Sequence, residues 1–316
     1  MHGTAAPTTL SGVLAPDDPF ERVEVTVADA QGVLADQHPD LAGLPVRVGG
    51  SGWDNATFRL GDDLAVRMPV RGIGDVLAAN EQAWLPHLAP RLPLPTPVPV
   101  RTGHATDAYP WRWSVVPWIP GRPALHAPPE DPVESASVLG EFVRALRATA
   151  PPEAPPNPYR GQPLAERATL TVAHLDSLGD DHPDQAGLDA AELRACWEWH
   201  VAVPVWTGEP QWIHGDLHPL NLVVDRGAIA GVLDFGDVTS GDPATDLFAA
   251  WVLFDGAARQ RFLDLTADDE AMRRRGRGWA LAMAAAYLAN REDHNVLRPL
   301  GRRTIEAVLA DWRDHP

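Results

Sequence analysis

Lysine is absent from this sequence, and the 26 residues counted as lysine or arginine are all arginine. Acidic residues number 43, and the formal net charge at pH 7 is −17. A chain this acidic lacks the basic surface that displaces counterions from nucleic-acid phosphates, so we expect no nucleic-acid partner. The negative charge favours solubility and would also attract a cationic small substrate. Any role that usually belongs to lysine must here fall to another residue.

Cysteine and long apolar runs are also scarce. The single cysteine, Cys196, cannot form an internal disulfide, and we interpret it as a small buried hydrophobic residue. No window approaches the roughly 18 consecutive apolar residues that a membrane helix needs. The N-terminus lacks the basic and apolar regions of a secretory signal. We therefore expect a cytoplasmic protein without a membrane partner.

The length of 316 residues favours two lobes, and their patterns differ. Residues from about 20 to 70, beginning with "RVEVTVAD", alternate β-like runs with glycines, which indicates a small antiparallel sheet. Residues 75–88 have helical spacing, and "WRWSVVPWI" is β-like again. The breaker "PGRP" follows, so we place an N-lobe at 1–119 and a C-lobe at 120–316.

The C-lobe is predicted to be mainly helical, which makes the fold class α+β. Residues 132–148 have amphipathic periodicity, and helical patterns resume near Leu164, near Asp189 and after Pro243. Between them, "NLVVDRGAIAGVLDF" has two apolar runs that flank Asp225-Arg226-Gly227, as in a β-hairpin.

This hairpin predicts a metal site. Its two ends meet in space, which brings Asn221 close to Asp234. An amide oxygen and a carboxylate at one point suit Mg²⁺, which takes few protein ligands and completes its shell with water and phosphate. Asp216 lies in the preceding loop, where it would orient an attacking hydroxyl and accept its proton.

The segments "HGDLHPLN" and "LDFGD" resemble the catalytic loop and the metal-binding segment of the aminoglycoside phosphotransferase family, antibiotic kinases with the protein-kinase-like fold. The resemblance implies a bilobal fold, ATP or GTP as phosphate donor, and Mg²⁺. It implies Asp216 as catalytic base and Asn221 and Asp234 as magnesium ligands. It assigns His214 to the loop scaffold.

Two other residues near these motifs keep alternative roles. His218 either packs the loop or makes a polar contact near the transferred phosphate. Asp237 is either a second metal contact or a hydrogen-bonding residue of its loop.

In the N-lobe, "GGSGWDN" resembles the nucleotide-binding loop, with Gly50, Ser51 and Gly52 around the phosphates, although a plain hairpin turn would explain the glycines too. The base that contacts the α and β phosphates is normally lysine in this fold. Here Arg67 in "LAVRMP" matches that position, with Arg71 as a rival. Glu81 is its expected ion-pair partner, unless it is an exposed helix carboxylate.

The linker "SVVPWIPG", with Val116, Trp118 and Ile119, is expected to bind adenine through its backbone. Pro117 and Pro120 have no amide hydrogen, so the donor is Trp118 or Ile119. The Trp118 side chain is also a candidate for packing between the lobes.

The acceptor site is the least specified part. Tyr159, Asp242, Glu292 and Asp293 are the candidate residues, and the three carboxylates would hold an amino group of the acceptor. An exposed helix end explains Glu292 and Asp293 equally well.

The resemblance implies a kinase that phosphorylates a hydroxyl of an antibiotic and so confers resistance, as a monomer or homodimer. A metabolic kinase of choline, homoserine or a sugar amine shares the same motifs. A catalytically idle nucleotide-binding module would explain the missing lysine.

Overall fold

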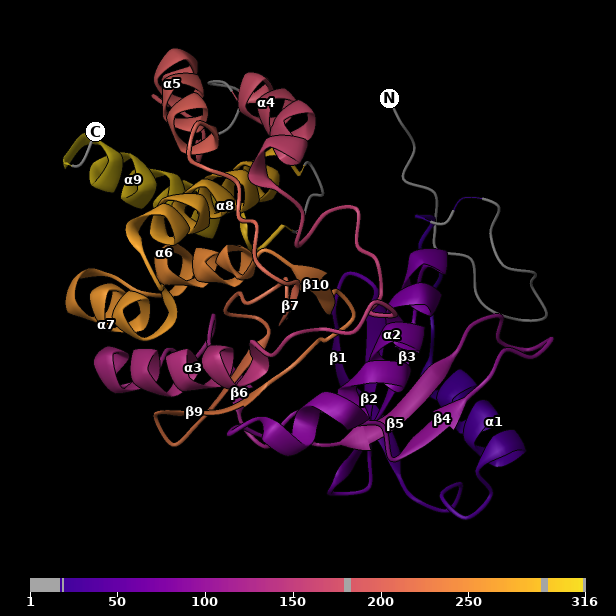
Figure 1. Ribbon diagram of the computed structural model, residues 1–316. Helices are drawn as coiled ribbons and strands as arrows, with labels where there is room; N and C mark the ends of the chain where they lie inside the picture. Colours follow the sequence, from indigo (N-terminus) through magenta and orange to yellow (C-terminus); the bar gives the residue numbers. More distant parts are fainter. Residues whose placement is uncertain (1–17, 19, 179–182, 291–294, 315–316) are drawn as a thin grey trace. The chain divides into compact units, whose positions relative to one another are not determined.

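The computed structural model describes residues 18, 20–178, 183–290 and 295–314 (Figure 1). The chain divides into two compact units. The N-terminal unit contains the chain up to Pro120 together with Ala230–Asp237. The C-terminal unit contains Gly121–Ile229 and the chain from Val238 onward.

The N-terminal unit is built on a five-stranded antiparallel sheet of order β1-β2-β3-β5-β4. Its β2 alternates half-buried and buried residues, so Ala56, Phe58 and Leu60 form one apolar face. This face contributes to the unit's core. The strands are β1 (Val46–Ser51), β2 (Asn55–Leu60), β3 (Leu64–Pro69), β4 (Arg101–Gly103) and β5 (Trp113–Pro117).

Two α-helices, α1 (Val27–Gln37) and α2 (Gly72–Leu88), and the short η1 (Ala89–Arg91) accompany this sheet. The prediction of a strand at "RVEVTVAD" is wrong. Thr26 and Asp29 form a capping box, in which each side chain accepts a hydrogen bond from the other's backbone amide, and α1 therefore starts at Val27. The alternation of apolar residues before Thr26 concealed this start signal.

The C-terminal unit has short strands that surround its catalytic loop. A sheet of order β6-β8-β9 contains the predicted hairpin, which turns at Arg226 (φ 47°) and Gly227 (φ 79°). A second, two-stranded sheet pairs β10 with β7. The strands are β6 (Arg122–Pro123), β7 (Gln211–Ile213), β8 (Leu222–Asp225), β10 (Thr239–Gly241) and β9 (Ala228–Val232), whose residues from Ala230 onward belong to the N-terminal unit.

Helices make up most of the rest of this unit, and α8 packs against both α9 and η3. The helix predicted at 132–148 is present as α3. Capping side chains set several starts: Asp131 accepts from Val133 and Glu134, and Asp189 from Ala191 and Glu192. The helices are α3 (Pro132–Leu146), η2 (Leu164–Arg167), α4 (Ala168–Ser177), α5 (Ala190–Val201), η3 (Pro243–Phe248), α6 (Ala249–Leu253), α7 (Gly256–Thr266), α8 (Glu270–Ala289) and α9 (Arg298–Asp314).

The observed units differ from the predicted lobes in one segment. Residues Ala230–Asp237, which the sequence analysis counted with the C-lobe, belong to the N-terminal unit. The amide of Val232 donates to the carbonyl of Pro95 at 3.0 Å, and the amide of Phe235 donates to Glu81 at 2.8 Å. The α+β fold class is confirmed by the antiparallel sheet of one unit and the helices of the other.

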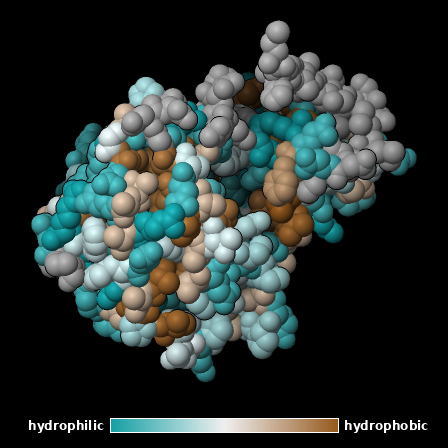
Figure 2. All heavy atoms as spheres, turned by 90° about the horizontal axis from the view of Figure 1, so that it is seen from above, coloured by the Kyte–Doolittle hydropathy of each residue, from teal (hydrophilic) through white to brown (hydrophobic). Residues whose placement is uncertain are grey.

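One face of the surface is largely hydrophilic (Figure 2). On the face drawn in Figure 2, hydrophilic side chains cover most of the area and hydrophobic ones lie among them in small groups. Among the described helices, we find none that combines the length and the apolar character needed to cross a bilayer.

Candidate active site

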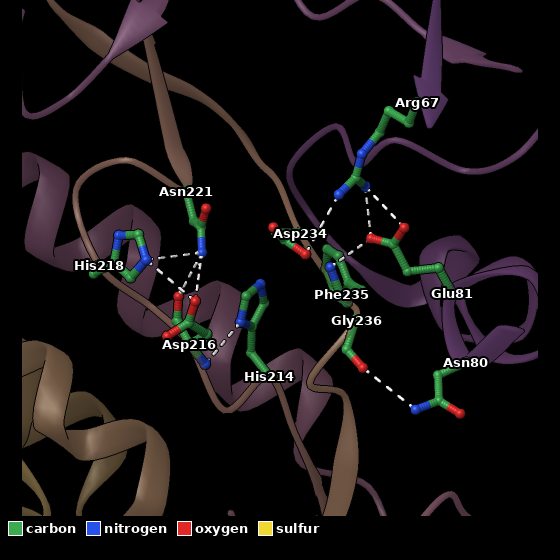
Figure 3. Close-up of polar contacts among 10 residues, drawn as sticks. All are labelled: Arg67, Asn80, Glu81, His214, Asp216, His218, Asn221, Asp234, Phe235 and Gly236. Carbon is green, nitrogen blue, oxygen red and sulfur yellow. Dashed lines mark hydrogen bonds and ion pairs between the residues drawn. The ribbon is translucent and has the colours of Figure 1, made fainter. Parts of the chain in front are cut away.

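A buried ion pair connects the centre of the N-terminal sheet to helix α2. Arg67 lies on β3, and its Nη1 donates to both carboxylate oxygens of Glu81, at 2.7 and 2.8 Å (Figure 3). Its Nη2 lies 3.4 Å from Oδ1 of Asp234. The expected pairing of Arg67 with Glu81 is thus present. Glu81 is only 6% exposed, so the alternative that it is an exposed carboxylate of the helix is wrong. Arg71 is the residue that precedes α2 and is not on β3.

The opposite charges in this cluster favour each other's ionised forms. Burial lowers the pKa of Arg67, but the carboxylates of Glu81 and Asp234 outweigh burial and raise it above its usual value. Burial raises the pKa of Glu81, and the nearby Arg67 opposes that shift. The guanidinium is therefore a permanent cation, and its match to the family's phosphate-contacting lysine stays a prediction.

Asp234 has a left-handed backbone. Its φ is 60°, which is uncommon for a residue with a side chain and usually requires support from the surroundings. Glu81 supplies such support by accepting the amide of Phe235, and Asn80 donates to the carbonyl of Gly236 at 3.3 Å. The Asp234 carboxylate itself is 40% exposed. This carboxylate is available to a ligand. Asp237 is the last residue of the segment Ala230–Asp237, and its role stays a prediction.

The glycine-rich stretch forms the turn between β1 and β2. The register shifts between Val48 and Gly50, which makes a bulge at Gly49. A Cβ on Gly49 would meet the carbonyl oxygen of Thr57 at 3.1 Å, so glycine permits this close approach. The Gly52 amide donates to Asn55 at 2.8 Å.

The hairpin turn kept as the alternative is therefore present. Phosphate binding by Gly50, Ser51 and Gly52 stays a prediction, and the Ser51 side chain lies outside what the structure describes.

The structure removes one of the two candidate adenine donors in the linker. The Trp118 amide donates to the carbonyl of Asp63 at 2.8 Å, which removes Trp118 from the two candidate adenine donors. Within the described residues, the Ile119 amide has no acceptor, so it remains. We expected the Trp118 ring to pack between the lobes; inside the N-terminal unit it lies under the guanidinium of Arg59, at 5.2 Å. Val116 is in β5, opposite Ala65.

In the C-terminal unit, the catalytic loop is closed by hydrogen bonds around Asp216 (Figure 3). The side-chain nitrogen of Asn221 donates to the backbone oxygen of Asp216 at 2.9 Å and to its Oδ2 at 3.0 Å. Nδ1 of His218 accepts from the Leu220 amide at 3.2 Å, so the ring carries its proton on Nε2 when neutral. That nitrogen lies 3.1 Å from Oδ2 of Asp216. His218 thus bonds within its own loop and contacts the Asp216 carboxylate, while a contact near the transferred phosphate stays a prediction.

A buried carboxylate anchors the start of this loop. Asp246 of η3 is 1% exposed and accepts the amides of His214 at 2.7 Å and of Gly215 at 2.8 Å. The His214 ring is fully buried, and its Nδ1 accepts from the Asp216 amide at 3.2 Å, which agrees with the predicted scaffold role. Gly215 has φ 83°, a conformation that glycine adopts without strain.

The surroundings of Asp216 keep it ionised. Burial raises its pKa, but His218, Arg160 and His214 together lower it below the usual range. Arg160 donates from Nε to the Gly215 carbonyl at 2.6 Å, and its Nη2 is 3.7 Å from Oδ1 of Asp216. The sequence did not predict this role for Arg160, because Arg160 lies in an irregular loop and its contact at Gly215 is 55 positions later in the chain.

The two proposed metal ligands each fit a hard cation. Because Asn221 turns its nitrogen toward Asp216, its amide oxygen is left without a hydrogen bond among the described residues. Asp234 contributes a carboxylate. Oxygens of these kinds are the ligands that Mg²⁺ prefers. Asn221 belongs to the C-terminal unit and Asp234 to the N-terminal unit, so their joint binding of one ion stays a prediction.

The predicted acceptor residues are not alike. Asp242 is 4% exposed; it caps η3, as the Asp242-Pro243 pair predicts for a helix start, and it also pairs with the buried Arg275 at 2.6 Å. With both oxygens engaged, Asp242 is poorly placed to hold an amino group. Tyr159 is 49% exposed. Glu292 and Asp293 lie outside the described residues.

The fold defines a kinase-like phosphotransferase. Residues 45–303 match the model of the phosphotransferase enzyme family, known as APH, so the chain belongs to that family. The resemblance inferred from the catalytic segments is confirmed.

Solved structures with the same fold cover nearly the whole chain. The GDP complex of aminoglycoside 2'-phosphotransferase-IIIa has a TM-score of 0.67 and 18% identity, over 91% of this chain and 99% of that one. Macrolide 2'-phosphotransferase MphH from Brachybacterium faecium has a TM-score of 0.55 and 22% identity, over 88% and 97%. At these identities the likeness establishes the fold.

A curated relative matches more locally. The uncharacterized protein YcbJ of Bacillus subtilis (strain 168) is 36% identical over 85 residues, which are 27% of this chain and 28% of YcbJ. The match thus spans less than a third of that relative.

Proposed function

We propose that the protein is a kinase that transfers the γ-phosphate of ATP or GTP to a hydroxyl group of an antibiotic and so inactivates it. The observation that carries the proposal is the ionised Asp216, oriented by Asn221 and His218. Both solved relatives are named as phosphotransferases of antibiotics, and one holds a guanine nucleotide. The proposal places the enzyme in the cytoplasm, as a monomer or homodimer.

In this mechanism, Asp216 orients the acceptor hydroxyl and takes its proton as the new O–P bond forms. Asn221 and Asp234 would hold Mg²⁺, which neutralises charge on the phosphates when it is bound. Arg67, fixed by Glu81, contacts the nucleotide phosphates, and the Ile119 amide meets the adenine or guanine edge. The transition state of phosphoryl transfer is loose, so positioning and charge neutralisation supply most of the catalysis.

The test is nucleotide turnover with Mg²⁺ across aminoglycosides, macrolides, and peptide and nucleoside antibiotics, with product mass as readout. One antibiotic should gain a phosphate, and Asp216→Ala should lower kcat by about 10²-fold or more while the Kd for the nucleotide stays nearly constant. Asp225→Ala, at the partly exposed end of β8 beside the hairpin turn, is the control. If Asp216→Ala retains full activity, the proposed base is wrong.

A second candidate is an idle nucleotide-binding module, which the arginine at position 67 favours. Nucleotide binding without phosphorylation of any hydroxyl compound would support it. A metabolic kinase of choline, homoserine or a sugar amine would instead phosphorylate those compounds and leave all antibiotics unchanged.

A further inference from the structure

Among the described residues, Arg167 is a buried cation that lacks an anionic partner. It ends η2, is 4% exposed, and forms no ion pair with any carboxylate of the described residues. Its Nε is enclosed and has no hydrogen-bond partner. A buried charge without a counter-charge costs free energy, because the charged group loses its hydration and no ion pair compensates for that loss.

Two aromatic rings compensate part of this cost. The Arg167 guanidinium lies 5.7 Å from the ring centre of Tyr159 and 5.8 Å from that of Trp279 on α8. Such contacts attract a cation through the negative face of the ring, but they are weaker than an ion pair. Trp279 is fully buried and forms a closed wall, whereas Tyr159 is half exposed. Of the two rings beside the guanidinium, Tyr159 is therefore the one that a ligand from solvent can reach.

A second cation stands beside the first. Burial, followed by the positive charge of Arg160, lowers the pKa of Arg167 to about 10, so Arg167 remains charged at neutral pH. Arg160 in turn reaches Asp216, with Nη2 3.7 Å from Oδ1. The two arginines thus extend from the catalytic carboxylate toward Tyr159, and their mutual repulsion would be relieved by a bound anion.

We propose that Arg167, with Arg160 and Tyr159 beside it, binds an oxyanion group, a carboxylate or a phosphate, on the hydroxyl acceptor. Guanidinium groups match such oxyanions with paired hydrogen bonds. The inference rests on the proposed kinase function and narrows the acceptor to hydroxyl compounds with an acidic group. Polycationic aminoglycosides would meet the positive charges of Arg160 and Arg167 at this site, so we expect them to be poor substrates.

Anion binding can be measured on the whole protein without knowing the acceptor. Sodium phosphate and sodium malonate, each against sodium chloride at equal ionic strength, should raise the Tm of the wild type in a saturable way. Arg167→Met, which keeps an unbranched apolar stem between the two rings, should lose that increase. Arg194→Met, at an exposed arginine of α5 paired with Asp176, should keep it. A larger response to one anion than to the other distinguishes phosphate from carboxylate.

Two further measurements keep the inference separate from loss of folding and from the kinase proposal. Arg167→Lys retains the charge and should keep the anion response with affinity about tenfold weaker. The Tm increase with Mg-ATP is recorded for every variant: its absence from the wild type contradicts the kinase proposal, whereas its presence with no anion response contradicts this inference alone. An equal anion response in wild type and Arg167→Met, or phosphorylation of aminoglycosides with the same kcat/KM in both, also overturns it.

Discussion

A single nitrogen of Arg67, Nη1, contacts both carboxylate oxygens of Glu81, at 2.7 and 2.8 Å. A guanidinium can bind a carboxylate with two of its nitrogens, one to each oxygen. Here the second nitrogen, Nη2, is directed to Asp234 instead. Arg67 therefore makes with Nη1 the contact that a lysine ammonium would make, and it adds a contact to the proposed metal ligand.

Replacement of Arg67 by lysine should consequently be tolerated. We expect Arg67→Lys to bind Mg-ATP within about tenfold of the wild-type Kd, because one ammonium can still reach Glu81, and Arg67→Ala to bind at least 100-fold more weakly. Isothermal titration with each variant checks this. If lysine is as damaging as alanine, the planar guanidinium itself is required for the nucleotide.

Removal of Glu81 should destabilise the N-terminal unit. Glu81→Ala leaves Arg67 buried next to Asp234 alone, and loss of one partner of a buried ion pair costs roughly 3–5 kcal/mol. The matched control is Asp75→Ala on the same helix, whose partner Arg112 is half exposed, and there we expect about 1 kcal/mol or less. Urea unfolding measures both, and equal losses would contradict the difference in burial.

Cys196 should be inert in the folded protein. The thiol is fully buried, and burial raises its pKa to about 12, so almost no thiolate forms at pH 8. We expect iodoacetamide to add one label in 6 M guanidinium chloride and almost none under native conditions, as read by intact mass. Rapid native labelling would show that α5 opens locally.

His200 should make stability depend on pH in the acid range. It is fully buried, and burial lowers its pKa to about 3, against an ordinary value near 6.5. Between these values the unfolded chain binds a proton that the folded chain does not, so stability falls as pH decreases from 6.5 toward 3. The slope from this residue is at most about 1.4 kcal/mol for each pH unit.

Urea unfolding of His200→Gln at pH 7, 6 and 5 isolates this contribution. The variant should lose less stability than the wild type as the pH falls. His126→Gln, at an exposed histidine, should follow the wild type. Parallel curves for His200→Gln and wild type would mean that this ring is protonated, or exposed, in the folded state.

The elements that the sequence predicted well depend on local patterns. The hairpin needs only two apolar runs and a turn that accepts positive φ, and Arg226 and Gly227 provide that turn. The pairing of Arg67 with Glu81 was expected from the resemblance, and the structure contains it.

Other features depend on contacts that no local pattern encodes. The pairing of Asp242 with Arg275 joins residues 33 positions apart, and no local pattern in the sequence links them. Helix α1 was missed because a capping box at Thr26 outweighed the β-like alternation before it. The Trp118 amide became unavailable through a turn carbonyl at Asp63, which sequence spacing does not reveal.

The arginine on β3 also bears on how this protein would be found in a cell extract. Acyl-phosphate derivatives of ATP label kinases by transferring their acyl group to an amine beside the phosphates. The Arg67 guanidinium, whose pKa is raised by Glu81 and Asp234, carries no free electron pair for that reaction. Because the chain contains no lysine, nucleotide occupancy here is better followed by a measurement that needs no reactive amine, such as the Tm increase with Mg-ATP.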